Sequence, residues 1–291
     1  MKHLDLFSGI GGFALAAQWC WADRHEVVAF CEQDPWARRI LAKHWPGVPC
    51  ISDIRNFPGT PVYASDVGIC GLCGEPYCGD HEKHYSDCEC LGPDQIERFY
   101  DIDLLTAGWP CQDNSNANQS STRCTGLDGE RSGLWHELIR VMGETKPRWA
   151  VLENVSNVLR VNKGRDWGRC LRDLAQIGYD AEWECLRASQ FGAPHHRERV
   201  FVVAHPSGNR SQADESIFSL LRPTERKAQC RVSTGTTVMV GGDWSSKPPV
   251  CGVDDGVPNR THRARGLGNA IVPQVAFHLM TAIRQVDKPI S

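Results

Sequence analysis

Short apolar runs that alternate with amphipathic stretches restrict the possible folds of this chain more than any other feature. The runs predicted as buried strands span 3–7, 26–30, 101–108, 148–154 and 199–204. Between them, apolar residues recur at helical spacing over 12–22, 35–45, 132–145 and 164–177. This alternation predicts an α/β fold with a doubly wound, mostly parallel sheet, whose ligands bind at the carboxyl ends of the strands.

Two segments interrupt this alternation and predict the domain organisation. Residues 66–93 are rich in Cys, His and Gly and lack a hydrophobic period, so we expect an insertion within a first domain over 1–204. Residues 205–262 are rich in Ser, Gly, Pro and Thr, which predicts a loop-rich lobe. The last part, 263–291, contains an apolar helix and is expected to return to the first domain.

Overall charge does not favour a polyanionic partner, because 32 Lys and Arg face 35 Asp and Glu, for a net charge of −3. Nucleic-acid binding would therefore need a locally basic surface. Residues 205–265 offer one, with nine basic and six acidic side chains and hence a local charge of +3. The chain has no run of eighteen apolar residues and no signal peptide at its start, so we expect a cytoplasmic protein without a membrane partner.

The glycine-rich stretch "DLFSGIGGF" (5–13) follows the first predicted strand and opens a helix. Such a turn lets a ligand approach the backbone closely and presents the amides of a helix N-terminus. Glu32 lies at the end of the strand over 26–30, and Asp53 lies in "SDI" (52–54), which ends a further candidate strand. Acids at such strand ends can accept hydrogen bonds from a ribose and an adenine amino group. Because the turn lacks the Lys-Ser/Thr pair that cradles phosphates, these features indicate S-adenosylmethionine.

Four reactive side chains are predicted at the same rim of the sheet. Cys111 follows the strand over 101–108, and Glu153 lies at the carboxyl end of the strand over 148–154. Arg197 and Arg199 lie two positions apart at the start of a later strand, so both can face the same side. A thiolate, a carboxyl group and two guanidinium groups would then meet near a methyl donor. The alternative for Cys111 is a buried thiol with no chemical role.

With these residues, the chain resembles the DNA cytosine-5 methyltransferases, and the resemblance covers nearly its whole length. The motifs that carry it, in the order of the family, are "DLFSGIGGF", "CEQD", "SDI", "GWPCQ", "GERSGLW", "ENV", "FGAPHHRERVF" and "GLGNAIVP". One position departs from the family, because His195 stands where a glutamine usually begins the arginine motif.

The resemblance implies transfer of a methyl group to C5 of a cytosine that has been flipped out of duplex DNA. Cys111 would add to C6, Glu153 would hold N3, and Arg197 and Arg199 would supply positive charge. It also makes 1–204 the catalytic and cofactor-binding domain and 205–262 the target-recognition lobe. The residues implied in cofactor binding are Phe7, Ser8, Gly9, Gly11, Gly12, Glu32, Gln33, Asp53, Ile54, Pro110, Leu134, Asn269 and Ala270.

Two other functions share parts of this pattern. The tRNA-methylating branch of the family has the same catalytic motifs, and a catalytically silent protein could bind nucleic acid without turnover. The compact chain and its variable lobe favour duplex DNA by analogy with bacterial and phage enzymes. We expect a monomer that needs no obligatory protein partner.

The segment 70–90 contains seven possible metal ligands, in the pattern C-x2-C-x4-C-x2-H-x2-H-x3-C-x-C. The pair Cys70 and Cys73, followed by glycine, has the spacing of a zinc knuckle, and Cys88 and Cys90 would complete a tetrahedral site. The rival ligands are Cys78, His81 and His84. A structural zinc ion is therefore expected, with a reduced Cys-rich loop as the alternative.

Overall fold

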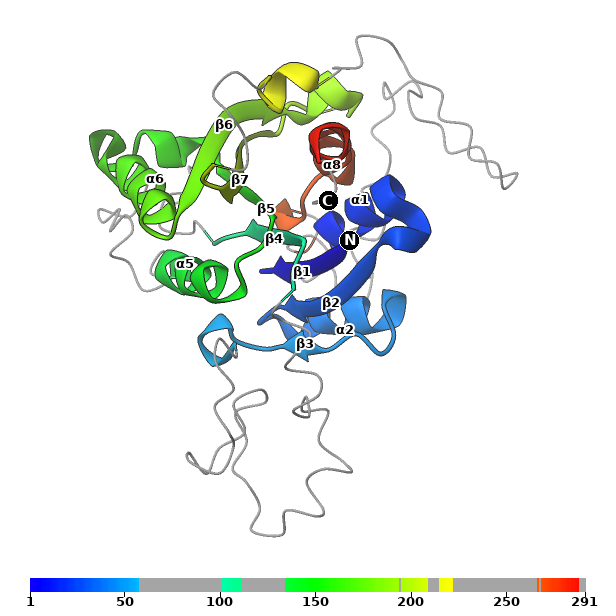
Figure 1. The fold of residues 1–291 in the computed structure, drawn as a ribbon. Helices are drawn as coiled ribbons and strands as arrows, with labels where there is room; N and C mark the ends of the chain where they lie inside the picture. Colours follow the sequence, from blue (N-terminus) through cyan, green and yellow to red (C-terminus); the bar gives the residue numbers. More distant parts are fainter. Residues whose placement is uncertain are drawn as a thin grey trace, which may run out of the picture.

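The computed structural model describes residues 1–57, 101–110, 134–193, 195–208, 215–221, 266 and 268–287, which form a sheet with helices on both faces (Figure 1). The sheet has seven strands in the order β3-β2-β1-β4-β5-β7-β6. These strands are β1 (Lys2–Leu6), β2 (Glu26–Cys31), β3 (Cys50–Ile51), β4 (Leu104–Gly108), β5 (Trp149–Val155), β6 (Tyr179–Arg187) and β7 (Glu198–Pro206). Strands β1 to β5 are parallel, and β7 is antiparallel to both its neighbours. The predicted α/β class and mostly parallel sheet are confirmed.

Each face of the sheet has its own hydrophobic core. Helices α1 (Gly12–Trp21) and α8 (Pro273–Val286) cover one face, and α5 (Leu134–Thr145) and α6 (Arg165–Gln176) cover the other. Helix α2 (Pro35–His44) packs beside α1 against β2. The short 3-10 helices are η1 (Ala22–Arg24), η2 (Ile54–Asn56), η7 (Ser156–Leu159), η8 (Val161–Gly164), η9 (Ala188–Phe191) and η10 (Phe218–Leu220).

Strand β6 is the element that the apolar pattern did not predict. It forms an edge of the sheet and pairs only with β7 among the described strands. Asp180 and Glu184 are exposed, and Trp183 is 44% exposed while it packs edge-on against Trp167 of α6. An edge strand with a solvated face needs few apolar residues, so its sequence shows no buried run.

The chain order reverses between β1 and β4, which are hydrogen-bonded neighbours at the centre of the sheet. From β1 the chain proceeds outward through β2 to β3, whereas from β4 it proceeds to β5 on the other side. The connections after β1 and β4 therefore diverge at their carboxyl ends. Such a switch point is where open α/β sheets bind ligands.

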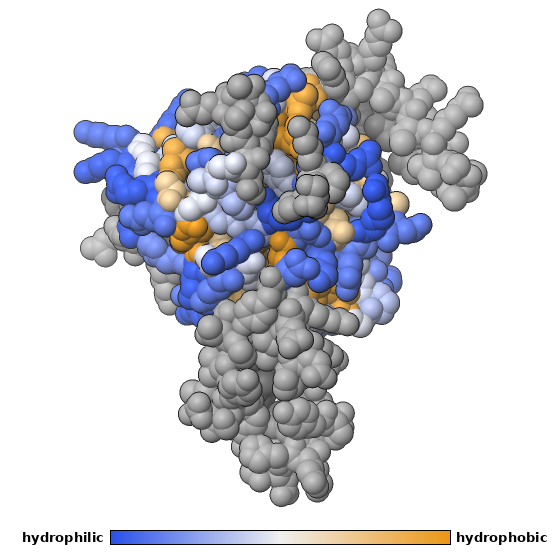
Figure 2. Space-filling view, in the orientation of Figure 1, coloured by the Kyte–Doolittle hydropathy of each residue, from blue (hydrophilic) through white to orange (hydrophobic). Residues whose placement is uncertain are grey.

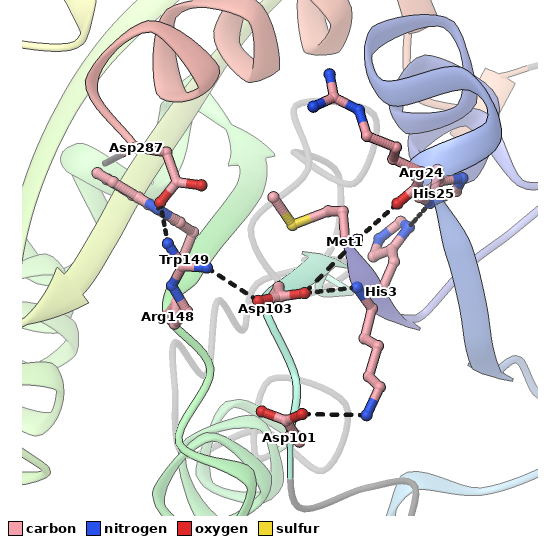
Figure 3. A network of polar contacts seen from close by, with 10 residues as sticks. Met1, His3, Arg24, His25, Asp101, Asp103, Arg148, Trp149 and Asp287 are labelled. Atoms are coloured by element: carbon pink, nitrogen blue, oxygen red, sulfur yellow. Dashed lines mark hydrogen bonds and ion pairs between the residues drawn. The ribbon is translucent and has the colours of Figure 1, made fainter. Parts of the chain in front are cut away.

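The opposite, amino-terminal edge is tied together by polar contacts (Figure 3). Asp103, just before β4, accepts a hydrogen bond from the Lys2 amide at 2.8 Å and pairs with Arg148 at 3.1 Å. Arg148 also pairs with Asp287 at the end of α8, and the Trp149 indole donates to the same carboxylate at 3.0 Å. This network joins β1, β4, β5 and α8 at the edge away from the switch point.

Only part of the segment predicted as the lobe is described. Ile217 and Phe218 are buried in the core beneath α8, and the Ile217 amide donates to Glu182 of β6 at 3.1 Å. The rest of 205–262, and the whole insertion 66–93, lie outside the described residues. On the face in Figure 2 the described surface is mostly hydrophilic, with separate apolar areas. None of the described helices has the length and apolar character needed to cross a bilayer.

Substitution of Gly11 tests the packing behind the glycine turn. Gly11 has a φ of +85°, and a Cβ built there would lie 2.5 Å from the Trp45 ring. We expect Gly11→Ala to lower the free energy of unfolding by about 2 kcal/mol or more, from backbone strain and overpacking together. The measurement is urea denaturation.

The control is Gly168→Ala, on the exposed surface of α6, where a new Cβ would meet no atom within 4 Å. It should raise the unfolding free energy by roughly 0.5–1 kcal/mol, because alanine favours a helix over glycine. Equal effects of the two substitutions would contradict the prediction.

Candidate active site

The glycine turn after β1 uses backbone conformations that side chains rarely adopt. Gly9 and Gly11 have φ values of +55° and +85°, and Phe7, which is not a glycine, has +53°. The Ser8 amide donates to the Cys31 carbonyl at 3.0 Å, which ties the turn to the end of β2. A left-handed phenylalanine costs on the order of 1–3 kcal/mol and persists only where its surroundings impose it. Such strain is concentrated at functional sites.

Helix α1 begins directly after the turn and has no side-chain cap. Gly11 is the N-cap of α1 and supplies no side-chain hydrogen bond to the first amides of the helix. A Cβ added to Gly9 would meet no atom of the described residues within 4 Å. In contrast, a Cβ on Gly12 would lie 3.0 Å from Ile271, which packs tightly there. An uncapped helix N-terminus is chemically suited to a carboxylate or another anionic group.

Glu32 is joined directly to the glycine turn. Its two carboxylate oxygens accept hydrogen bonds from the Gly9 amide at 2.7 Å and the Asp34 amide at 2.8 Å. Burial raises the pKa of Glu32, and these two amides oppose the rise. Because each carboxylate oxygen has two lone pairs, the oxygens can still accept hydrogen bonds from a ligand's hydroxyls.

Asp53 lies beyond β3 and already has a cationic partner. Its carboxylate caps η2 by accepting from the Arg55 amide at 3.0 Å, and the Arg55 guanidinium binds it at 2.8 Å. These hydrogen bonds lower the pKa of Asp53. Ile54, next in the chain, is buried, whereas Gln33 near the end of β2 is exposed.

The ends of β4 and β5 lie side by side at the rim. Gly108 faces Glu153 in the strand register, and a Cβ on Gly108 would lie 3.6 Å from a Glu153 carboxylate oxygen. Trp109 is buried against Trp135 of α5, with the ring centroids 5.1 Å apart. The next residue, Pro110, is partly buried. Cys111, the predicted nucleophile, lies outside the described residues.

Glu153 and Arg199 form an ion pair at this rim. The Arg199 Nε lies 3.0 Å from Oε1 of Glu153, and the glutamate is only 8% exposed. Burial raises the pKa of Glu153, while the charges of Arg199 and then Arg197 oppose the rise. The structure thus brings together three of the four residues predicted to react.

Arg197 and Arg199 have different partners, although the sequence predicts one shared role. The two terminal nitrogens of Arg197 donate to the carbonyls of Gly268 at 2.7 Å and Ala270 at 2.8 Å. Beside the two arginines and Glu153 is a cavity of about 10 Å³, room for about one water molecule, whose apolar lining includes Val272.

Other predicted site residues are placed as follows. Leu134 begins α5 and packs against the core, Asn269 is exposed, and Ala270 is partly buried where Arg197 holds its carbonyl. The described part of the chain contains no group of three His, Cys, Asp or Glu that could hold a metal ion. The predicted zinc ligands Cys70, Cys73, Cys88 and Cys90 fall outside it, as do their rivals.

A buried polar chain beneath the glycine turn was not predicted from the sequence. Asp5 accepts a hydrogen bond from the Thr106 hydroxyl at 2.6 Å, and Thr106 contacts His3 at 2.7 Å. His3 in turn contacts His25 at 3.0 Å, and Figure 3 shows these two rings. The second carboxylate oxygen of Asp5 has no hydrogen-bond partner among the described residues. The available signal was the pair of polar residues, His3 and Asp5, on one face of an otherwise apolar strand.

The buried carboxyl group of Asp5 in this hydrogen-bonded series predicts that the stability of the protein depends on pH. Burial raises the pKa of Asp5 to about 7, so between its ordinary value and about 7 the folded protein keeps a proton that the unfolded chain has lost. Stability should therefore fall as the pH rises through this window and level off above it. Asp5→Asn should remove a few kcal/mol of this decline between pH 5 and pH 8, measured by denaturation without ligand.

Thr106→Val provides the comparison. It keeps the carboxyl group but removes the hydroxyl that lowers the pKa of Asp5, so the decline should extend to higher pH. Identical pH profiles for wild type and Asp5→Asn would contradict the assignment.

Comparisons with known proteins agree with the sequence motifs. The model of the family described as C-5 cytosine-specific DNA methylase matches residues 73–237. The Type II methyltransferase M2.BsuMI of Bacillus subtilis (strain 168) is 30% identical over 208 residues, which are 70% of this chain and 42% of that protein. The Type II methyltransferase M.NlaX of Neisseria lactamica is 29% identical over 204 residues, 69% of this chain and 51% of that protein. The chain thus spans about half the length of these relatives.

Among solved structures, the Entamoeba histolytica methyltransferase EhMeth superposes with a TM-score of 0.56, at 15% identity, over 99% of both chains. That likeness supports the fold. The family model covers more than half of the 291 residues. The chain therefore belongs to the C-5 cytosine-specific DNA methylase family.

Proposed function

We propose that this protein transfers a methyl group from S-adenosylmethionine to C5 of a cytosine in duplex DNA. The observation that carries the proposal is the buried Glu153 carboxyl group, paired at 3.0 Å with Arg199 beside the end of β4. From that strand end the chain continues within three residues to Cys111. Membership of the family supports the same assignment.

The residue types match the needs of the reaction. C5 of cytosine is too weak a nucleophile to attack a methyl sulfonium, so Sγ of Cys111, as the thiolate, first forms a bond to C6. The electron pair displaced from the C5–C6 double bond makes C5 nucleophilic. C5 would then take the methyl group as the bond between the methyl carbon and the sulfonium sulfur breaks, and S-adenosylhomocysteine would leave with that electron pair. A base then takes the proton from C5, and the returning electron pair breaks the bond between C6 and Sγ. The cysteine thiolate is thereby regenerated.

Glu153 would assist by donating a hydrogen bond to N3 of the cytosine. Only the protonated carboxyl group can donate, and burial raises the pKa of Glu153 in that direction. The Arg199 guanidinium holds the carboxyl group in place from one side. It is also a positive charge at the rim that would favour the thiolate form of Cys111.

The switch point fits S-adenosylmethionine, which supplies an electrophilic methyl group on its sulfonium. The uncapped α1 N-terminus would suit the ligand's carboxylate, and the remaining lone pairs of Glu32 would suit ribose hydroxyls. Asp53 would receive the adenine amino group while it keeps Arg55. The Asp5 oxygen that lacks a partner within the described part of the chain would suit a water molecule or a cationic group.

Duplex DNA is the proposed substrate, bound by a monomer. The target base must leave the helix to react, at a cost of roughly a few kcal/mol that contacts in the pocket offset. The lobe over 205–262 would make the contacts with DNA, and its local positive charge supports that role.

Replacement of the proposed nucleophile tests the reaction. Cys111→Ser should abolish transfer of labelled methyl groups to duplex DNA and covalent trapping by DNA that contains 5-fluorocytosine, because the hydroxyl is a far weaker nucleophile. S-adenosylmethionine binding should persist. Cys185→Ser, which changes a partly buried thiol on β6, is the matched control and should keep both activities.

The outcomes separate the possible functions. Full activity of Cys111→Ser would remove that residue from the mechanism. Methylation of tRNA alone would overturn the choice of DNA, and no methylation of either substrate by the wild type would favour a silent binding protein. Bisulfite sequencing of a host that expresses the wild type would show both the activity and its target sequence.

A structural zinc ion in the segment 70–90 is a further part of this proposal, supported by the knuckle spacing of Cys70 and Cys73. Metal analysis of the purified protein should give about one zinc per chain. The double substitution Cys70→Ser with Cys73→Ser should lose the metal, while Cys185→Ser should retain it. A folded wild-type protein without metal would contradict the prediction.

A further inference from the structure

Arg197 makes a two-pronged contact with the chain that precedes α8. Its two terminal nitrogens reach two different carbonyls, those of Gly268 at 2.7 Å and Ala270 at 2.8 Å. The backbone of Arg197 is itself held, because its carbonyl accepts a hydrogen bond from the Ala188 amide at 3.1 Å. The guanidinium therefore projects from a fixed point just before β7.

The segment that Arg197 grips, residues 268–272, also touches the glycine turn. We call it the closing segment. Ile271 packs so closely on Gly12 that a Cβ there would lie 3.0 Å away. Just before the segment, Gly266 packs against the Trp36 ring at the start of α2, where a Cβ would lie only 2.4 Å from the ring. The closing segment thus connects the β7 side of the sheet with the turn after β1.

The two hydrogen bonds from one guanidinium can hold the closing segment in place. A guanidinium can donate to two carbonyls at once from its planar fork, whereas a lysine ammonium is a point charge on a flexible stem. The Glu153 carboxylate compensates the charges of both arginines. The two carbonyls of the closing segment take one N–H group from each terminal nitrogen of Arg197, so this contact uses two of the five N–H donors of the guanidinium.

We propose that Arg197 is a positioning residue, which holds the closing segment against the glycine turn and so shapes the S-adenosylmethionine pocket. Arg199, in contrast, acts on the catalytic carboxyl group. The inference deepens the proposed function and rests on it for the identity of the ligand. The sequence alone assigned both arginines to one site, whereas this inference assigns each arginine to a different site.

The test compares Arg197→Lys and Arg197→Met with Arg199→Lys. The affinity for S-adenosylmethionine is measured by calorimetry without DNA, and hydrogen exchange is followed in the peptide that spans 266–275. Single-turnover methylation of duplex DNA at saturating S-adenosylmethionine separates turnover from cofactor affinity. Arg197→Lys preserves the charge, so it remains informative if Arg197→Met fails to fold.

We expect Arg197→Lys to weaken S-adenosylmethionine binding by about tenfold and to speed exchange in 266–275, because one of two charge-assisted hydrogen bonds is lost. Its single-turnover rate at saturation should stay within about threefold of wild type. Arg199→Lys should show the opposite pattern, with slower turnover and unchanged affinity and exchange.

Unchanged affinity of Arg197→Lys together with a raised KM for DNA would overturn the proposal in favour of a direct DNA contact. Failure of the proposed function would look different. If the wild type binds no S-adenosylmethionine, the methyltransferase assignment falls. Unchanged hydrogen exchange in the 266–275 peptide of Arg197→Lys would, independently of that result, overturn the role of Arg197 in holding the closing segment.

Discussion

The parallel pairing of β1 with β4 is the contact on which the rest of the structure depends. It places Asp5 opposite Thr106 in register, and it sends the chain away in opposite directions from the two strand ends. The glycine turn and the Trp109–Pro110 stretch consequently meet at one edge. The polar network on Asp103 ties down the opposite edge of the same strands. The site is therefore built on the most constrained part of the sheet.

Three acids at this edge are buried or partly buried, and each of them has different partners. Glu153 has a guanidinium partner, whereas Glu32 accepts two backbone amides and Asp5 accepts a single hydroxyl. A buried carboxyl group with weak compensation retains its proton to higher pH, which is why the pKa of Asp5 reaches about 7. Burial raises the pKa of all three acids, and hydrogen bonds or positive charges oppose that rise at each of them.

Local pattern was enough to predict the central strands and helices, because buried parallel strands leave continuous apolar runs. It did not predict β6, whose solvated edge position calls for charged residues such as Asp180 and Glu184. It also did not predict the series of hydrogen bonds from Asp5 to His25. The sequence of a strand does not indicate which distant side chains its polar residues will contact. The position of Cys111 stays a prediction, since that residue is outside the described part of the chain.

By itself the sequence determined the α/β class, the order of the motifs and the chemical types of the site residues. These depend on periodicity and on residue identity, which are local properties of the chain. Only the tertiary structure decided that Glu32 binds the Gly9 amide and that Arg199, rather than Arg197, pairs with Glu153. Two arginines two positions apart are equivalent in a linear pattern. They differ in the folded protein because the closing segment, from the far end of the chain, accepts hydrogen bonds from Arg197.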